Sequence, residues 1–200
     1  YNCLVSINCG HHLTLLISRF QFMKNILVTG GAGFIGSHTC LLLLEQGYEI
    51  FVIDSFENSS SKSLQRLLEI NKLRKKEFSQ KLNVFKGDLI NKIFLEEVFS
   101  NLKKNNIELH GVIHFAGLKS VSDSFKDPLN YWKSNVSGTI NLLEMTKKYN
   151  CKNFVFSSSA TIYADNKNLL LSESSEINPV NPYGNTKATI EKLLEDVFLS

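Results

Sequence analysis

Short apolar runs alternate along the chain with longer stretches of helical periodicity. The apolar runs are residues 25–29, 49–53, 82–85, 111–115 and 153–156. Runs of this length, rich in β-branched and aromatic residues, are typical of strands buried on both faces of a sheet. The helical patterns between and after them are residues 35–46, 61–76, 92–104, 128–149 and 183–198. Strand and helix alternate without hairpin turns, so the pattern predicts an α/β fold with a doubly wound parallel sheet and helices on both faces.

The first 22 residues do not share this pattern. Their apolar stretch, residues 13–17, is too short to span a membrane. A secretory signal would need a positive start and a small-residue cleavage site, and both are poor in this segment. Met23 leads directly into the first predicted strand. We therefore expect residues 1–22 to be a non-native or disordered N-terminal extension and residues 23–200 to form one domain. The chain stops at Ser200 without a turn signal after an apolar helix, so we expect it to be a fragment.

Composition excludes several classes of protein. The net charge of +3 gives no case for binding nucleic acid or a membrane. The four cysteines form no CxxC pair, and no histidine cluster has zinc-ligand spacing, so neither a disulfide framework nor a metal site is expected. This cysteine usage fits the reducing cytoplasm.

Glycines follow the first predicted strand in the pattern G-x-x-G-x-x-G, at Gly30, Gly33 and Gly36. Glycine permits a tight turn and lets the backbone approach a pyrophosphate, and the following helix start offers free N–H groups and a positive dipole end. A tight turn without a ligand is the alternative. Because the glycines lie between a strand and a helix, we predict a Rossmann-type dinucleotide site.

Acidic residues follow the next two predicted strands. Asp54 could accept hydrogen bonds from the ribose 2′-hydroxyl of adenosine and repel a 2′-phosphate, which favours NAD over NADP. A turn residue at the strand end is the other interpretation of Asp54. Asp88 could cap the next helix or accept from the adenine amino group, and the sequence does not separate these two roles.

Five motifs, in order, resemble the extended short-chain dehydrogenase/reductase family. They are TGGAGFIGSH, GDL, HFAGLKSV, SSSAT and PYGNTK. The glycine pattern and Tyr-x-x-x-Lys are typical of the whole superfamily, whereas HFAGLKSV and SSSAT are similar to the UDP-glucose 4-epimerase branch. The resemblance covers residues 23–200 and implies an NAD-binding Rossmann domain, truncated before the substrate-binding C-terminal portion. It also implies that NAD and a UDP-sugar are bound, that UDP-galactose and UDP-glucose are interconverted through a 4-keto sugar, and that the full-length protein is a homodimer.

The resemblance also assigns roles to individual positions. The cofactor-binding residues that it implies are Gly30, Gly33, Phe34, Ile35, Gly36, Asp54, Asn58, Ser59, Asp88, Leu89, Phe115, Ala116, Gly117, Lys119, Asn135, Ser157, Tyr183 and Lys187. The implied substrate-binding residues are Lys119, Ser159, Thr161 and Tyr183. Three positions depart from the pattern of the family: Phe34 replaces a common tyrosine, Glu57 replaces an uncharged residue, and Ala164 replaces a glycine.

The chemistry centres on Tyr183 and Lys187, which lie four residues apart on one face of a helix. A nearby ammonium is expected to lower the pKa of the phenol, so that Tyr183 could act as general base for a sugar hydroxyl. The resemblance assigns Ser159 as the partner of Tyr183, and its hydroxyl, which both donates and accepts, would hold the substrate oxygen and relay its proton. An exposed helix pair is the alternative for Tyr183 and Lys187, a packed helix residue for Asn135, and a solvated loop lysine for Lys119.

Other functions stay open at this point. A nucleotide-sugar 4,6-dehydratase would need an acid and a base in the loop after the fifth predicted strand, where this chain has Ala160 and Thr161. A non-catalytic NAD-binding module is possible because the expected substrate portion lies beyond residue 200. Other nucleotide-sugar epimerases and reductases of the same family are further alternatives.

Overall fold

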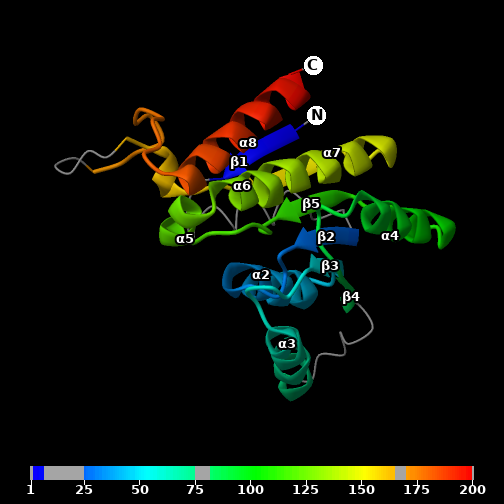
Figure 1. The fold of residues 1–200 in the computed structure, drawn as a ribbon. Coiled ribbons are helices and arrows are strands. Elements are labelled where there is room, and N and C mark those ends of the chain that lie inside the picture. Colours follow the sequence, from blue (N-terminus) through cyan, green and yellow to red (C-terminus); the bar gives the residue numbers. More distant parts are fainter. Residues whose placement is uncertain (1, 7–24, 75–81, 165–169, 200) are drawn as a thin grey trace.

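The computed structural model of the protein describes residues 2–6, 25–74, 82–164 and 170–199. These residues form a six-stranded parallel sheet with the strand order β1-β6-β5-β2-β3-β4 (Figure 1). The strands are β1 (Asn2–Ser6), β2 (Asn25–Thr29), β3 (Glu49–Asp54), β4 (Leu82–Lys86), β5 (Gly111–His114) and β6 (Asn153–Ser157). The predicted doubly wound parallel sheet is confirmed.

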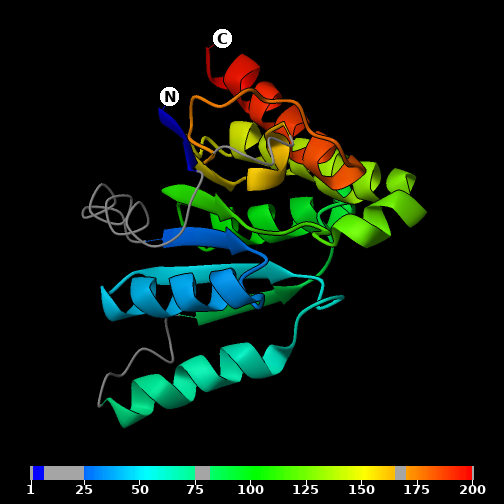
Figure 2. The same cartoon turned by 90° about the vertical axis from the view of Figure 1, so that its left-hand side faces the viewer.

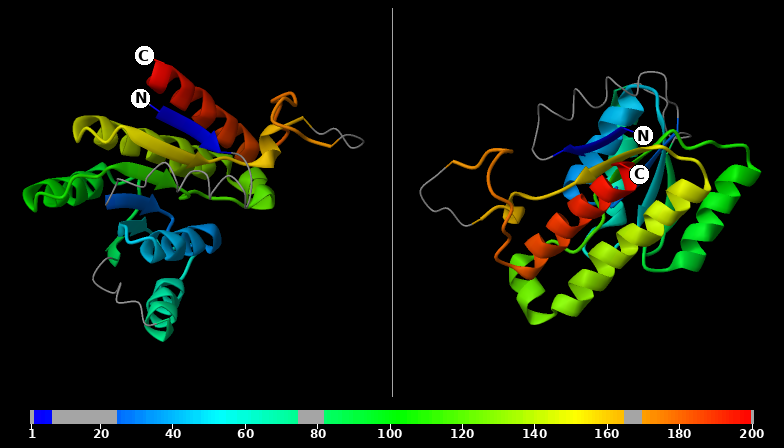
Figure 3. Two further views of the ribbon diagram at one scale, coloured as in Figure 1. Left: turned by 180° about the vertical axis from the view of Figure 1, so that it is seen from behind. Right: turned by 90° about the horizontal axis from the view of Figure 1, so that it is seen from above.

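Helices cover both faces of the sheet (Figures 2 and 3). On one face lie α2 (Phe34–Glu45) and α3 (Ser61–Leu73). The other face is covered by α4 (Lys92–Lys104), α7 (Gly138–Lys148) and α8 (Pro182–Leu199). In the described part of the chain, no helix has the length and apolar character needed to cross a bilayer.

Side-chain alternation along the strands explains the two layers of core. In β2, Ile26 and Val28 pack toward α2, whereas Leu27 packs toward α4 and α7. All three side chains are fully buried. Successive residues of a strand point to opposite faces, so a continuous apolar run is what a strand covered on both sides requires.

The predicted helix over residues 128–149 is interrupted. It consists of α6 (Pro128–Tyr131), a π-helical segment (Trp132–Ser137) and α7, and it is preceded by an unpredicted short helix, α5 (Val121–Lys126). Hydrophobic periodicity does not distinguish a π turn from an α turn, which is why the prediction of one regular helix was wrong here. π turns inside α-helices occur frequently at functional sites.

Helix ends follow the signals in the sequence. Gly47, just after α2, has a φ of +90°, the left-handed conformation expected of a C-terminal glycine. Asn181 accepts a hydrogen bond of 2.7 Å from the Gly184 amide and so caps α8. Within the predicted extension, Asn2–Ser6 form β1 at the sheet edge beside β6, and residues 7–24 lie outside the described part. The division of the chain at residue 23 stays a prediction.

Candidate active site

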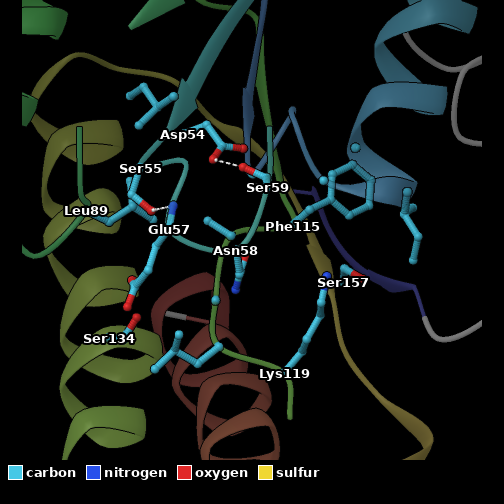
Figure 4. Close-up of a pocket in the computed structure, with 18 of the residues that line it drawn as sticks. Asp54, Ser55, Glu57, Asn58, Ser59, Leu89, Phe115, Lys119, Ser134 and Ser157 are labelled. Carbon is cyan, nitrogen blue, oxygen red and sulfur yellow. Dashed lines mark hydrogen bonds between the residues drawn. The ribbon is translucent and has the colours of Figure 1, made fainter. Parts of the chain in front are cut away.

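A cavity of about 440 Å³ opens at the carboxyl ends of the strands (Figure 4). The chain runs from β2 outward to β3 and β4, then returns to β5 on the other side of β2. This reversal creates the switch point at which open α/β sheets bind ligands. The cavity is lined from the loops after β2, β3, β4, β5 and β6 and from the start of α8.

The glycine loop forms one wall of this cavity with its backbone. Gly30 has a φ of +69°, and a Cβ added there would lie 2.6 Å from the Ala116 amide nitrogen. At Gly36 an added Cβ would collide with the Gly30 carbonyl oxygen. No side chain caps the first turn of α2, whose N-cap residue is Gly33. The helix start therefore presents amide donors to the cavity, as an anion site does.

Asp54 is fixed at the end of β3 by three hydrogen bonds. Its Oδ2 accepts from the Ala32 amide (2.9 Å), and its Oδ1 accepts from the Phe56 amide (2.9 Å) and the Ser59 hydroxyl (2.8 Å; Figure 4). The residue is 7% exposed and lines the cavity. Asp54 therefore orders the turn, as one interpretation expects, and its fixed carboxylate also faces the cavity, so that ribose binding stays a prediction.

Asp88 lines the cavity but does not cap the following helix. Its Oδ1 accepts from the Ile90 amide at 2.9 Å, whereas the cap of α4 is Asn91, which accepts from the Phe94 amide at 3.1 Å. The capping role considered for Asp88 is therefore wrong. Its position in the cavity wall leaves ligand contact as the open role.

Tyr183 and Lys187 project from the start of α8 into the opposite wall. Both are buried, so the alternative of an exposed helix pair is wrong. The Lys187 ammonium donates to the Ser157 carbonyl oxygen at 2.9 Å and lies 4.5 Å from the centre of the Phe156 ring. The Tyr183 ring meets the Tyr131 ring edge-to-face at 6.4 Å.

Burial controls the ionisation of both groups. Desolvation lowers the pKa of Lys187 to about 8, and the Glu191 carboxylate opposes this shift. Desolvation raises the pKa of Tyr183, and a hydrogen bond with Ser159 works in the opposite direction. We expected Lys187 to lower the pKa of Tyr183 below its ordinary value. That expectation is wrong, because burial raises the pKa of the phenol more than the hydrogen bond with Ser159 lowers it.

Ser159 lies beside Tyr183, whereas Thr161 and Asn135 lie behind the wall. Ser159 Oγ accepts from the Thr161 hydroxyl at 3.0 Å, so Thr161 orients Ser159 but does not line the cavity. The Asn135 side chain is 2% exposed; it accepts from the Leu118 amide and donates to the Leu118 carbonyl oxygen and the Thr186 hydroxyl. Its polar atoms face protein partners, which is the packed interpretation of Asn135.

All other predicted site residues line the cavity. They are Gly30, Gly33, Phe34, Ile35, Gly36, Asp54, Asn58, Ser59, Asp88, Leu89, Phe115, Ala116, Gly117, Lys119, Ser157, Ser159, Tyr183 and Lys187. The residues of the lining that were not predicted are Ile53, Ser55, Glu57, Gly87, Leu118, Ser134 and Ser158. Each is adjacent in sequence to a predicted residue, and this adjacency was the available signal.

Comparison with known proteins places the chain in a family. The family model described as GDP-mannose 4,6 dehydratase matches residues 27–198. The chain belongs to this family. Its match extends over the glycine loop, both carboxylate positions and the helix of Tyr183 and Lys187.

Curated relatives of the chain include several proteins named UDP-glucose 4-epimerase. UDP-glucose 4-epimerase 2 of Arabidopsis thaliana is 47% identical over 177 residues, which is 88% of this chain and 48% of that protein. The UDP-glucose 4-epimerase of Bacillus subtilis is 44% identical over 172 residues, which is 86% of this chain and 47% of that protein. The chain thus spans about half the length of the curated relatives it matches.

Solved structures give the same result. A UDP-glucose 4-epimerase from Bifidobacterium longum, solved in complex with NAD⁺ and UDP, superimposes with a TM-score of 0.77 at 39% identity. The superposition covers 88% of this chain and 49% of that chain. The predicted resemblance to the UDP-glucose 4-epimerases is confirmed for this portion.

Proposed function

We propose that this chain is the NAD-binding portion of a UDP-glucose 4-epimerase. The full-length protein would interconvert UDP-galactose and UDP-glucose by reversible hydride transfer at sugar C4 through a 4-keto sugar. The observation that carries the proposal is the meeting of Tyr183, Lys187 and Ser159 with the glycine loop in one cavity. The relatives at 43–47% identity that are named UDP-glucose 4-epimerases support it.

The residues of the cavity fit a dinucleotide. The glycine loop leaves space that any Cβ would fill, and the uncapped start of α2 suits a pyrophosphate. Asp54 would hold the adenosine ribose and disfavour a 2′-phosphate, which supports NAD over NADP. When bound, NAD supplies a reversible hydride acceptor beside the sugar.

The chain's own residues would handle the proton of the sugar 4-hydroxyl. Tyr183 would accept it as general base, and Ser159 would hold the same oxygen and orient its hydrogen bond. Lys187, anchored on the Ser157 carbonyl oxygen, places a buried positive charge 5.9 Å from the centre of the Tyr183 ring. That charge favours the phenolate as the proton moves, although burial alone raises the pKa of Tyr183.

Dehydration is the less favoured reaction, even though the family model is described by a dehydratase. Elimination of water needs an acid and a base positioned together. The positions after Ser159 are Ala160 and Thr161, in a short 3₁₀ helix, and neither side chain is an acid or base of suitable pKa. The site therefore supports oxidation and reduction at C4 better than elimination.

Replacement of Tyr183 by phenylalanine tests the proposal in the full-length protein. We expect Tyr183→Phe to lower kcat for UDP-galactose conversion by about 10²- to 10⁴-fold, the usual contribution of a general base. Affinity for NAD, measured by titration, is expected to stay within a few-fold of the parent value. An unchanged rate would refute the role of Tyr183, and a parent protein that binds NAD without converting UDP-sugars would support a non-catalytic module.

Assembly and location remain further proposals. We propose a homodimer formed through α4 and α7, which carry the exposed side chains of Ile93 and Ile140. Light scattering of the full-length protein during size-exclusion chromatography tests this, and a monomer would contradict it. Cytoplasmic location is proposed from the cysteine pattern alone.

A further inference from the structure

A chain of hydrogen bonds crosses the core behind the cavity. The Ala116 amide meets Thr29 Oγ1 at 3.4 Å, and Thr29 Oγ1 lies 2.6 Å from His114 Nδ1. On the other side of the ring, His114 Nε2 lies 2.9 Å from Thr139 Oγ1. Thr139 Oγ1 in turn donates to the Asn135 carbonyl oxygen at 2.6 Å. The chain thus joins β2, β5, α7 and the π-helical segment.

The partners fix the direction of every bond in this chain. Thr139 uses its only proton on the Asn135 carbonyl oxygen, so it accepts from His114 and Nε2 carries the proton. Nδ1 is then the acceptor of a hydrogen bond from the Thr29 hydroxyl. Thr29 Oγ1 remains free to accept from the Ala116 amide. One tautomer of His114 satisfies all the donors and acceptors at once.

The histidine is held neutral by its surroundings. His114 is 1% exposed and lies beside the rings of Phe154 and Phe156 on the neighbouring strand, with centroids 5.8 and 5.6 Å away. Burial lowers its pKa to about 3, and the charge of Lys187 adds to this effect. A neutral imidazole keeps one donor and one acceptor, which is what the two threonines require.

The chain continues from Asn135 to the helix that carries Tyr183. Asn135 Nδ2 donates to the Thr186 hydroxyl at 3.1 Å, and that hydroxyl donates to the Tyr183 carbonyl oxygen at 2.7 Å. The same Asn135 side chain holds both backbone polar groups of Leu118, at 2.8 and 3.0 Å. The network therefore connects the loop after β5, at Ala116 and Leu118, with the backbone of Tyr183 in α8.

We propose that His114 and Thr139 are positioning residues, which set the loop of residues 115–118 and the start of α8 in register with one another. Neither residue lines the cavity, so they act through Ala116, Leu118 and Asn135. This inference rests on the proposed function, in which the cofactor-facing loop and Tyr183 must face the same sugar carbon. Directional bonds between buried groups transmit such a register better than apolar contacts do, because their geometry tolerates little displacement.

The test uses the full-length protein and a pair of substitutions at one position. Thr139→Val keeps the shape of the side chain but removes both the acceptor for His114 and the donor to Asn135. Thr139→Ser restores the hydroxyl. We expect Thr139→Val to lower NAD affinity and kcat for UDP-galactose by about tenfold each, as loss of a buried partner does. KM for the sugar should stay near the parent value, and Thr139→Ser should recover most of both losses.

Thr146→Val is the matched control. Thr146 is also a buried threonine of α7, and its hydroxyl donates to the Leu143 carbonyl oxygen at 2.8 Å, away from the network. Thr146→Val should destabilise the fold less than Thr139→Val does, because it leaves no buried donor without its acceptor, and it should leave NAD affinity unchanged. Equal effects of Thr139→Val and Thr146→Val on NAD affinity and kcat would reduce Thr139 to a structural role and overturn the proposal.

Nitrogen-15 NMR of the unsubstituted protein provides a second measurement that needs no variant. The network predicts that His114 carries its proton on Nε2 and does not titrate between pH 5 and about 8. A proton on Nδ1, or a charged ring in this range, would overturn the proposal. If the protein binds NAD with the predicted tautomer and the predicted loss in Thr139→Val but converts no UDP-sugar, the proposed function fails while the positioning role stands.

Discussion

The two walls of the cavity differ in composition, since one consists mainly of backbone atoms and the other of side chains. On the side of β2, α2 and β3, the wall is largely backbone: glycines that leave no room for a Cβ, and a helix start without a side-chain cap. On the side of β6 and α8, the wall is made of side chains, with Ser159, Tyr183 and Lys187 at its centre.

The electrostatics of the two walls differ accordingly. The α8 wall holds several buried titratable groups whose pKa values are displaced. Burial lowers the pKa of Lys187 and raises that of Glu191, and the Lys187 charge opposes the shift of Glu191. On the glycine wall, the groups that can recognise charge are backbone dipoles and Asp54, whose carboxylate accepts three hydrogen bonds from the chain and keeps acceptor capacity on Oδ2.

Under the proposed function, the glycine wall would bind the cofactor and the α8 wall would carry out the chemistry. A backbone site offers fixed partial charges that do not depend on pH, which suits a cofactor that stays bound. Buried ionisable side chains cost stability but provide groups that exchange protons near neutral pH. Substitutions should therefore act through steric exclusion on the first wall and through charge on the second.

The largest expected effect is steric, at Gly36. In Gly36→Ala the new methyl group would collide with the Gly30 carbonyl oxygen, and backbone cannot yield as a flexible side chain can. We expect NAD affinity, measured by titration calorimetry on the full-length protein, to fall by more than about 100-fold, since the loop must open to relieve the collision.

Gly47→Asn is the control for this substitution. Gly47 follows the C-terminus of α2, and a Cβ added there would have no atom within 4 Å. Asparagine tolerates the φ of +90° better than other non-glycine residues do. Its cost should be below about 1 kcal/mol of unfolding free energy, with NAD affinity unchanged. If Gly36→Ala binds NAD as well as Gly47→Asn does, the backbone cradle is not the nucleotide site.

The second prediction concerns charge, at Lys187. Burial lowers the pKa of Lys187 from its ordinary 10.5 to about 8. Below pH 8 the folded protein therefore bears the full cost of the buried charge, about 3 kcal/mol, and stability rises as pH increases from about 8 toward 10.5, where the unfolded chain binds more protons.

Lys187→Met removes this cost together with the charge. We expect its unfolding free energy at pH 7 to equal or exceed that of the parent, despite the lost hydrogen bond to Ser157, while kcat falls by about 100-fold. The parent should gain stability relative to the variant between pH 8 and 10. Lys192→Met, at an exposed position of the same helix, should change neither quantity. A Met variant that is less stable at pH 7 and fully active would contradict the assignment of Lys187.

The backbone wall was predictable from the sequence almost residue by residue. A site made by glycines and a helix start requires glycines at fixed spacing between a strand and a helix, and this spacing is visible without a structure. Asp54 was found for the same reason, since it ends the next strand. What the sequence could not show is that the Asp54 carboxylate is already held by Ala32, Phe56 and Ser59, because those contacts depend on how the turn folds.

The side-chain wall was predictable only in part. Tyr183 and Lys187 are linked by helical spacing, but Ser159 was found through resemblance. The sign of the Tyr183 pKa shift was missed, because burial cannot be inferred from spacing. His114 and Thr139 are 25 residues apart and belong to different elements, so no local pattern joins them. Long-range juxtaposition of buried polar groups is what required the structure.

The smallest expected effect is a difference between the alkylation rates of two buried cysteines when NAD is bound. Cys40 packs behind the glycine wall, where a Cβ added at Gly31 would lie 3.3 Å from its sulfur, and Cys151 belongs to the core beneath α7 and α8. Burial raises the pKa of each thiol to about 12, so both should resist alkylation in the native protein and react only through local opening. Saturating NAD should slow labelling of Cys40 several-fold more than that of Cys151, because ligand binding suppresses openings that disrupt its own site. Peptide mapping by mass spectrometry after timed alkylation distinguishes the two sites, and equal protection of both would mean that NAD stabilises the whole domain and not the glycine wall in particular.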